Sequence, residues 1–197
     1  MLFQTIVVDP PWRYRGNACV GDGGRGGVPK SAIARGSGAA AHYETLTNEQ
    51  IRGMNVGEFA ADNAYLFLWI TNSFLLEPDH PARSIPLAWG FRPVTVVTWA
   101  KHHKEDPATP SRKTGTYFRG ATEHVVFCVR GKLPMSAAPA TWFGSPRGRH
   151  SEKPDEFYRL VETVAPGPYL DVFARKIRPG WTSWGNEVPG GPNIVVS

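Results

Sequence analysis

Short runs of hydrophobic residues recur along the chain, and polar or Gly- and Pro-rich stretches separate them. Each run is rich in Val, Ile and aromatic residues and is nearly continuous in its hydrophobicity, a pattern typical of strands that are covered on both faces. The five runs comprise residues 5–8, 65–70, 94–99, 124–129 and 169–173. With helical segments between them, they predict an α/β fold built on one sheet.

Helix signals lie between these runs. Residues 46–61 contain a capping box, in which Thr47 is followed three positions later by Gln50, and one or two short helices fit there. Residues 73–89 should contain another helix, but Pro78, Pro81 and Pro86 cannot all lie within an unbroken one, so a shorter helix is expected near residues 82–89. The clearest helix covers residues 154–164, which begin with Pro, continue with two acidic residues and have one apolar face.

Three long segments fit no regular element: residues 13–41, 101–120 and 132–149. Loops of this size are uncommon in a compact domain unless they serve as lids or binding surfaces. The first has five basic residues against one acidic, a charge of +4, and the second has five against two, a charge of +3. Such loops would attract a phosphate-rich partner. Solvated loops that only maintain solubility are the alternative, and charge alone does not decide between them.

Composition and length narrow the class of protein. The chain of 197 residues, with a net charge of +5, is expected to be a single domain over residues 1–197, large enough to bury a core without disulfides or a structural metal. A hydrophobic content of 41% excludes a disordered or fibrous protein. No apolar run could span a membrane and the N-terminus does not resemble a secretory signal, so a cytoplasmic location and no membrane partner are expected. Cys19 and Cys128 are expected to be reduced, and no metal site is expected because no CxxC pair exists.

The motif Asp9-Pro10-Pro11-Trp12 directly follows the first predicted strand. In open α/β sheets, ligands bind beyond the carboxyl ends of the strands. Two consecutive prolines remove two backbone donors, which leaves rigid carbonyl acceptors beside the Asp9 carboxylate. Adenine suits such a site, because Asp9 and the Pro10 carbonyl would accept the two hydrogens of its amino group while Trp12 stacks on the base. The alternative is a strand that ends in a Pro-Pro turn, with Trp12 in the core.

An ordered series of blocks makes the chain similar to the MT-A family, named for the catalytic subunit of the eukaryotic messenger-RNA N6-adenosine methyltransferase. The tetrapeptide at residues 9–12 matches the DPPW signature of this family. The blocks that follow, in the order of bacterial members, are HY (42–43), NAYLFLWITN (63–72), WGF (89–91), VTWAK (97–101), RGATEHVVFCVRG (119–131), HSEKPDEFY (150–158), PGPYLDVFAR (166–175) and GWTSWGNE (180–187). The resemblance covers almost the whole chain.

The resemblance implies a Rossmann-like class I methyltransferase sheet with helices on both faces, permuted so that the catalytic motif precedes the cofactor motif. It implies methyl transfer from S-adenosyl-L-methionine to the 6-amino group of adenine, with Asp9, Pro10, Pro11 and Trp12 as catalytic residues. DNA is expected as the nucleic-acid partner in preference to RNA, because bacterial and phage relatives of this compact form look like DNA adenine methyltransferases. An RNA N6-adenosine methyltransferase and a non-catalytic nucleic-acid-binding subunit are the alternatives, and a homo- or hetero-oligomer stays open.

The resemblance also implies the residues that hold the cofactor. Ser151 and Lys153 are similar to a Ser/Thr-x-Lys-Pro segment near the methionine end of the cofactor, where a hydroxyl, an ammonium and a helix N-terminus could hold its carboxylate. Asn186 and Glu187 are similar to a terminal pair that binds the ribose hydroxyls. The implied cofactor-binding set is Asp9, Ser151, Lys153, Asp171, Phe173, Arg175, Asn186 and Glu187.

Basic side chains of the long loops are the expected contacts to nucleic acid. Some family members have Lys at the position of Thr122, so that contact near the cofactor is expected to be missing here. His124 opens an apolar strand and is expected to be a hydrogen-bonded structural histidine. The expected nucleic-acid-binding residues are Arg13, Arg15, Lys101, His102, Lys104, Arg112, Lys113 and Arg119.

Overall fold

A seven-stranded sheet forms the centre of the computed structural model, which describes residues 1–14, 45–112, 117–148, 152–186, 188 and 194–195. All five predicted strands are present, and two more were not predicted. The strands are β1 (Phe3–Val8), β2 (Ala60–Ile70), β3 (Arg92–His102), β4 (Thr122–Arg130), β5 (Trp142–Pro146), β6 (Tyr169–Val172) and β7 (Trp181–Trp184). Because β5 lies inside residues 132–149, the prediction that this segment lacks regular structure is wrong.

The strands lie in the order β5-β3-β4-β2-β1-β6-β7. The pairs β1–β2, β1–β6, β6–β7 and β3–β5 are parallel, whereas β4 is antiparallel to both β2 and β3. Among the described strands, β4 is therefore the one that runs against the others. The chain leaves β1 toward β2 on one side and later returns to β1 on the other side as β6. The carboxyl end of β1 is thus a point where the strand order reverses, the usual ligand position in such sheets.

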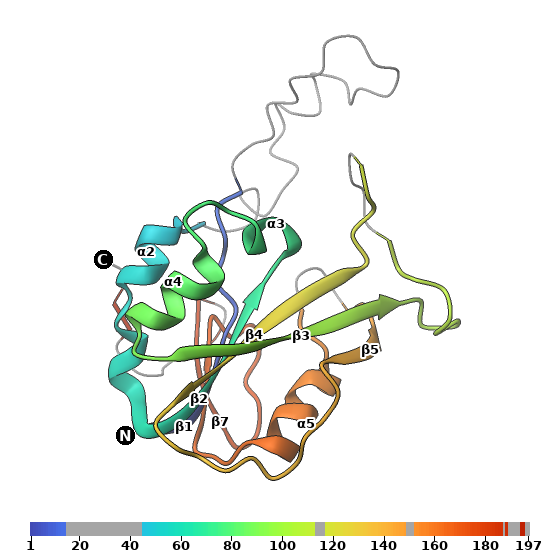
Figure 1. Ribbon diagram of the computed structural model, residues 1–197. Helices are drawn as coiled ribbons and strands as arrows, with labels where there is room; N and C mark the ends of the chain where they lie inside the picture. Colours follow the sequence, from blue (N-terminus) through green and yellow to red (C-terminus); the bar gives the residue numbers. More distant parts are fainter. Residues whose placement is uncertain (15–44, 113–116, 149–151, 187, 189–193, 196–197) are drawn as a thin grey trace.

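Helices pack on both faces of the sheet, as predicted (Figure 1). The Thr47 side chain accepts from the Gln50 N–H and the Gln50 side chain accepts from the Thr47 N–H, so the predicted capping box is confirmed. The described chain has no helix long and apolar enough to cross a membrane. The helices are α2 (Asn48–Gly53), the 3₁₀ helix η2 (Asn55–Phe59), α3 (Asn72–Leu75), α4 (Pro81–Ala88) and α5 (Asp155–Val164).

The core has two layers because successive side chains of a strand point to opposite faces of the sheet. On β1, Ile6 belongs to the cluster under α2, α3 and α4, whereas Val7 belongs to the cluster under α5. The α5 layer is mainly aromatic, with Phe157 edge-on to Trp69 at 4.7 Å between ring centroids. The nearly continuous hydrophobicity of β1 and β2 thus reflects burial on both faces.

The prediction that the apolar runs are covered on both faces is wrong for part of β3. Val94 and Val96 keep 50% and 36% of their surface exposed, whereas Trp99, on the α5 side, is buried. The β-branched residues here satisfy the conformational preference of an extended strand without being covered on both faces. Cys128 is buried as a free thiol, and Cys19 lies outside the described residues.

Candidate active site

The motif at the end of β1 is fixed by backbone hydrogen bonds. The Asp9 N–H donates to the Val172 carbonyl of β6 at 3.2 Å, and the Leu46 N–H donates to the Pro11 carbonyl at 2.8 Å. The Trp12 N–H donates to the Pro10 carbonyl at 2.9 Å, which leaves that oxygen one further lone pair. Asp9 therefore lies at the carboxyl end of β1, the first strand, as predicted, and its neighbours hold it rigidly.

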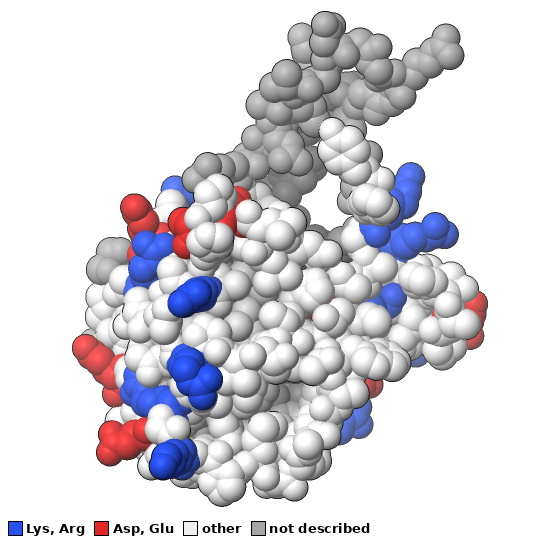
Figure 2. Space-filling model, viewed as in Figure 1, with Lys and Arg blue, Asp and Glu red and all other residues white. Residues whose placement is uncertain are grey.

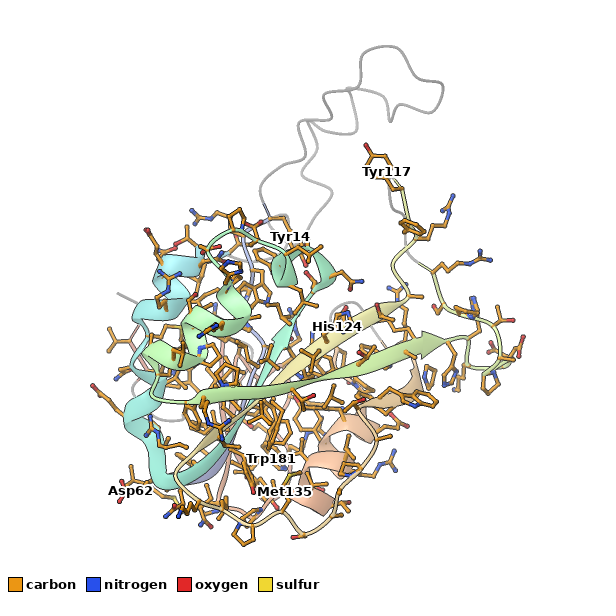
Figure 3. All side chains as sticks on the ribbon, in the orientation of Figure 1. Tyr14, Asp62, Tyr117, His124, Met135 and Trp181 are labelled. Carbon is orange, nitrogen blue, oxygen red and sulfur yellow. The ribbon has the colours of Figure 1, made fainter. Side chains whose placement is uncertain are left out.

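Trp12 does not lie where a stacking residue is needed. Its ring is 4% exposed and packs against Phe74 at 4.7 Å between centroids, and its indole N–H donates to the Trp69 carbonyl at 3.2 Å. The prediction that Trp12 stacks on a base is therefore wrong, because the residue is part of the core. Tyr14 is the exposed aromatic next to it, half exposed, with its hydroxyl 3.3 Å from the Thr71 Oγ1 (Figure 3).

Asp9 is one of four side chains of alternating charge that form a largely buried row. The Lys153 Nζ lies 2.9 Å from the Asp9 Oδ2 and 3.2 Å from the Glu123 Oε2, and Lys101 binds the other oxygen of Glu123. The Lys153 ammonium also lies 4.8 Å from the centroid of the Trp69 ring. The side chains come from β3, β4 and the segments after β1 and before α5, so the folded sheet assembles the row.

The charges in this row shift one another's pKa values. Burial raises the pKa of Glu123, but Lys153 and Lys101 outweigh it and bring that pKa down to about 2. The two carboxylates likewise outweigh burial at Lys153 and raise its pKa. At Asp9, burial outweighs Lys153, so the pKa of this carboxyl is raised. Of the two carboxyls, Asp9 is therefore the one that takes up a proton more readily.

A third carboxylate, that of Asp171, is buried on β6, the strand next to β1. The Tyr158 hydroxyl of α5 donates to the Asp171 Oδ2 of β6 at 3.0 Å, and the Arg178 guanidinium lies 3.5 Å from the centroid of the Tyr158 ring. Burial raises the pKa of Asp171 to about 7, against the lowering effect of the Tyr158 hydrogen bond. The sequence indicates neither Tyr158 nor Arg178 as a site residue, because helix periodicity marks Tyr158 only as a position beside the apolar face.

The Asp9 and Asp171 carboxylates open into one hollow with about 320 Å³ of empty space, part of it open to solvent. Phe173, at the end of β6, has a φ of 65°, a conformation that residues other than glycine seldom adopt and that often marks a ligand site. Five of the implied cofactor residues line the hollow together: Asp9, Lys153, Asp171, Phe173 and Arg175. Asn186 is exposed in the turn after β7 and is not among the lining residues, whereas Ser151 and Glu187 lie outside the described residues.

Comparison with known proteins decides which family the chain belongs to. The sequence profile of the MT-A70 family matches residues 3–187. The chain belongs to the MT-A70 family. MT-A70 proteins are methyltransferases that depend on S-adenosylmethionine and act on N6 of adenine or adenosine, so the family and the cofactor implied by the resemblance are confirmed.

Named relatives of this MT-A70 chain come from a bacterium, animals and plants. The type II methyltransferase M.MunI of Mycoplasma is 30% identical over 95% of this chain, which spans 78% of that relative. The human N(6)-adenine-specific methyltransferase METTL4 is 30% identical over 94% of this chain, and the human N(6)-adenosine-methyltransferase catalytic subunit METTL3 is 27% identical over 98%. The chain spans only 37% and 30% of the lengths of these two human proteins.

The hollow of this MT-A70 domain has the hydrogen-bond acceptors and the cationic groups that S-adenosylmethionine needs. The cofactor has an ammonium and two ribose hydroxyls, for which the buried Asp171 and the partly exposed Asp9 carboxylates are acceptors, and a carboxylate, for which Arg175 and Lys176 are cationic partners. Lys153 and Lys176 are each already held by two carboxylates, so a cofactor carboxylate would have to share either ammonium with them. These residues fit the cofactor.

Lys101 is not a nucleic-acid contact, contrary to prediction. Only 5% of the residue is exposed, because it is on the α5 side of β3, two positions after Trp99, and its ammonium binds Glu123. His102 is partly exposed at the end of β3, with its Nδ1 2.8 Å from the His103 carbonyl oxygen. The other described members of the predicted set, Arg13, Lys104, Arg112 and Arg119, are exposed, and Arg15 and Lys113 lie outside the described residues.

His124 and Thr122 take no part in the row of charges. The His124 Nδ1 lies 3.0 Å from the Thr98 Oγ1 on the neighbouring strand, as expected of a hydrogen-bonded structural histidine. The Thr122 hydroxyl lies 3.2 Å from the Asn72 Nδ2 at the start of α3. Lys101 supplies a buried ammonium next to this position, because residues 100 and 122 are partners across β3 and β4.

The raised pKa of Asp171 gives a pH-dependent contribution to stability. The carboxyl ionises near pH 4 in the unfolded chain but only near pH 7 when folded, so between these values the folded state holds the extra proton and stability falls as pH rises. Asp171→Asn, which keeps an acceptor for Tyr158, is expected to remove a decline of roughly 1 kcal/mol per pH unit. Urea unfolding of both proteins at pH 4.5, 5.5 and 6.5 measures this, and parallel stability curves would contradict it.

Proposed function

We propose that this chain transfers a methyl group from S-adenosylmethionine to the 6-amino group of adenine in DNA. The observation that carries the proposal is the position of the Asp9 carboxylate. It lies where the strand order reverses, it is held by Lys153 at 2.9 Å, and it faces the hollow that also contains Asp171 and Arg175. A carboxylate in this place can hold an exocyclic amine at the edge of a cofactor site.

Asp9 and its neighbours would position and polarise the amine. The bound cofactor supplies a methyl group on a positively charged sulfur. Asp9 accepts one N–H of the amine and the remaining lone pair of the Pro10 carbonyl accepts the other, which directs the nitrogen lone pair toward the methyl carbon. As the N–C bond forms and the S–C bond breaks, positive charge develops on nitrogen, and the Asp9 carboxylate stabilises it. The raised pKa of Asp9 suits it to receive the proton that the methylated nitrogen releases.

Two comparisons support DNA as the substrate. Of the three relatives described, M.MunI, a type II methyltransferase, is the one that this chain spans most fully, and METTL4 is named as specific for adenine. METTL3, named for adenosine, supports RNA as the second candidate at 27% identity. Exposed Arg13, Arg112 and Arg119 would bind the phosphates of either nucleic acid.

Labelled-methyl transfer tests the proposal. Single- and double-stranded DNA and RNA of matched sequence, each with adenines, are incubated with the protein and labelled S-adenosylmethionine, and the labelled nucleoside is identified. We expect N6-methyladenine in DNA, at a rate at least tenfold above that for RNA. A higher rate on RNA would contradict the substrate assignment, and the absence of label from all four would contradict the activity.

A further inference from the structure

Two adjacent aromatic residues are almost completely exposed in the connection between β3 and β4. Tyr117 keeps 94% and Phe118 93% of its surface exposed, the highest values among the large aromatic side chains of the described chain. Figure 3 shows Tyr117 at the tip of an arm that extends beyond the body of the protein. Burying an aromatic side chain is favourable, so two exposed neighbours indicate a surface that a partner covers.

The described part of this arm, residue 112 and residues 117–120, lies between two backbone hydrogen bonds of Lys101, a member of the row of charges. The Ser111 N–H donates to the Lys101 carbonyl and the Lys101 N–H donates to the Ala121 carbonyl, both at 2.8 Å. Phe118 comes five residues before Glu123, a length of chain that spans at most about 18 Å. The arm therefore begins where β3 ends and β4 starts, close to the place where Glu123 binds Lys153 and Lys153 binds Asp9.

The charge of the arm identifies the kind of partner. Arg112, Lys113 and Arg119 flank the aromatic pair in the sequence, and no acidic residue occurs between Asp106 and Glu123. The described Arg112 and Arg119 are exposed, and Figure 2 shows blue side chains at the base of the arm. Basic residues next to exposed aromatic rings suit a partner that has both phosphates and flat bases.

We infer that Tyr117 and Phe118 stack on bases of the nucleic-acid substrate, next to the adenine held at Asp9. This inference rests on the proposed function and adds the surface by which the substrate is held. Trp12, the aromatic that the sequence offers for stacking, is in the core, so the arm supplies exposed rings that the motif at β1 does not. The flanking arginines bind phosphates, and the two rings hold the neighbouring bases.

Binding measurements separate the rings from the charges. Stacking on an aromatic ring contributes enough per base that Y117A/F118A is expected to raise the Kd for adenine-containing DNA about tenfold or more, without changing the slope of log Kd against log salt. R112Q/R119Q is expected to reduce that slope by about two, because each of its two substitutions removes a phosphate contact. Y117W/F118W, which keeps two rings, is expected to bind within about threefold of the wild type.

Trp142→Ala is the matched control, because Trp142 is 63% exposed at the start of β5, at the opposite end of that strand from the site. It should leave Kd unchanged, and thermal unfolding should show that every variant is folded. A Kd for Y117A/F118A within twofold of the wild type overturns the inference. These measurements need no turnover, so failure of the inference is distinguishable from absence of methyl transfer by the wild type, which would contradict the proposed function.

Discussion

Asp9→Ala is expected to abolish methyl transfer while the protein stays folded. The substitution removes the acceptor that orients the amine and the charge that stabilises the developing cation, and the loss of one such preorganised group lowers kcat by about a thousandfold. Lys153 keeps Glu123 as a partner at 3.2 Å, so the buried ammonium is not left unpaired. Labelled-methyl transfer under single-turnover conditions measures the effect.

Asp9→Asn tests the charge of this carboxylate separately from its acceptor oxygen, and Asp79→Asn is the control for loss of an acidic residue elsewhere. Asp9→Asn keeps an acceptor oxygen without the charge, so it is expected to retain more activity than Asp9→Ala. Asp79 forms an ion pair with Arg52 on the surface, outside the hollow, and its substitution should leave the rate unchanged. Near-normal turnover by Asp9→Ala, with thermal unfolding like that of the wild type, would show that another group performs its role.

Lys153→Met is expected to reduce both stability and activity. Methionine fills a similar volume but leaves the Asp9 and Glu123 carboxylates, at 19% and 16% side-chain exposure, facing each other without the ammonium between them. Removing one partner of a buried ion pair costs about 3 kcal/mol of unfolding free energy. The rate should fall at least a hundredfold, because the Asp9 carboxylate loses the contact that fixes its orientation.

Two further substitutions test whether the stability lost in Lys153→Met comes from the loss of the buried charge. Lys153→Arg keeps the charge and should recover most of the stability. Arg159→Gln removes an exposed pair with Glu156 and should cost no more than about 1 kcal/mol. Urea unfolding at pH 7 compares the variants. A Lys153→Met protein as stable as the wild type would contradict the role of the ammonium in holding the two carboxylates.

The central strands and the position of Asp9 could be predicted because local pattern decides them. Residues 5–8 and 65–70 are buried on both faces, so their hydrophobicity marks them as strands wherever they lie in the sheet. β5 and β7 were missed because they are the two edge strands, and the WFGSP and WTSW sequences mix polar and aromatic residues. An edge strand needs no continuous apolar run, since only one neighbour pairs with it.

The site residues that the sequence predicted wrongly or did not indicate have partners that are distant in sequence. Lys101 belongs to a basic stretch and therefore looks like a phosphate contact, but its role depends on Glu123, which only the pairing of β3 with β4 brings to it. Tyr158 and Asp171 meet because α5 packs against β6. Trp12 ends the motif whose Asp9 faces the hollow, yet the turn at Pro10 directs its ring into the core. Local sequence contains none of these pairings.

The reversed direction of β4 also bears on how the protein could be redesigned. Because β4 is antiparallel to β3, the two strands are joined as a hairpin by the long connection of residues 103–121, and no crossover helix is required. The residues of that hairpin between Ser111 and Ala121 can change in length or composition without altering the path of another strand. Grafting a different hairpin onto this frame would give the same chemical centre a new preference for its target, with the scaffold unchanged.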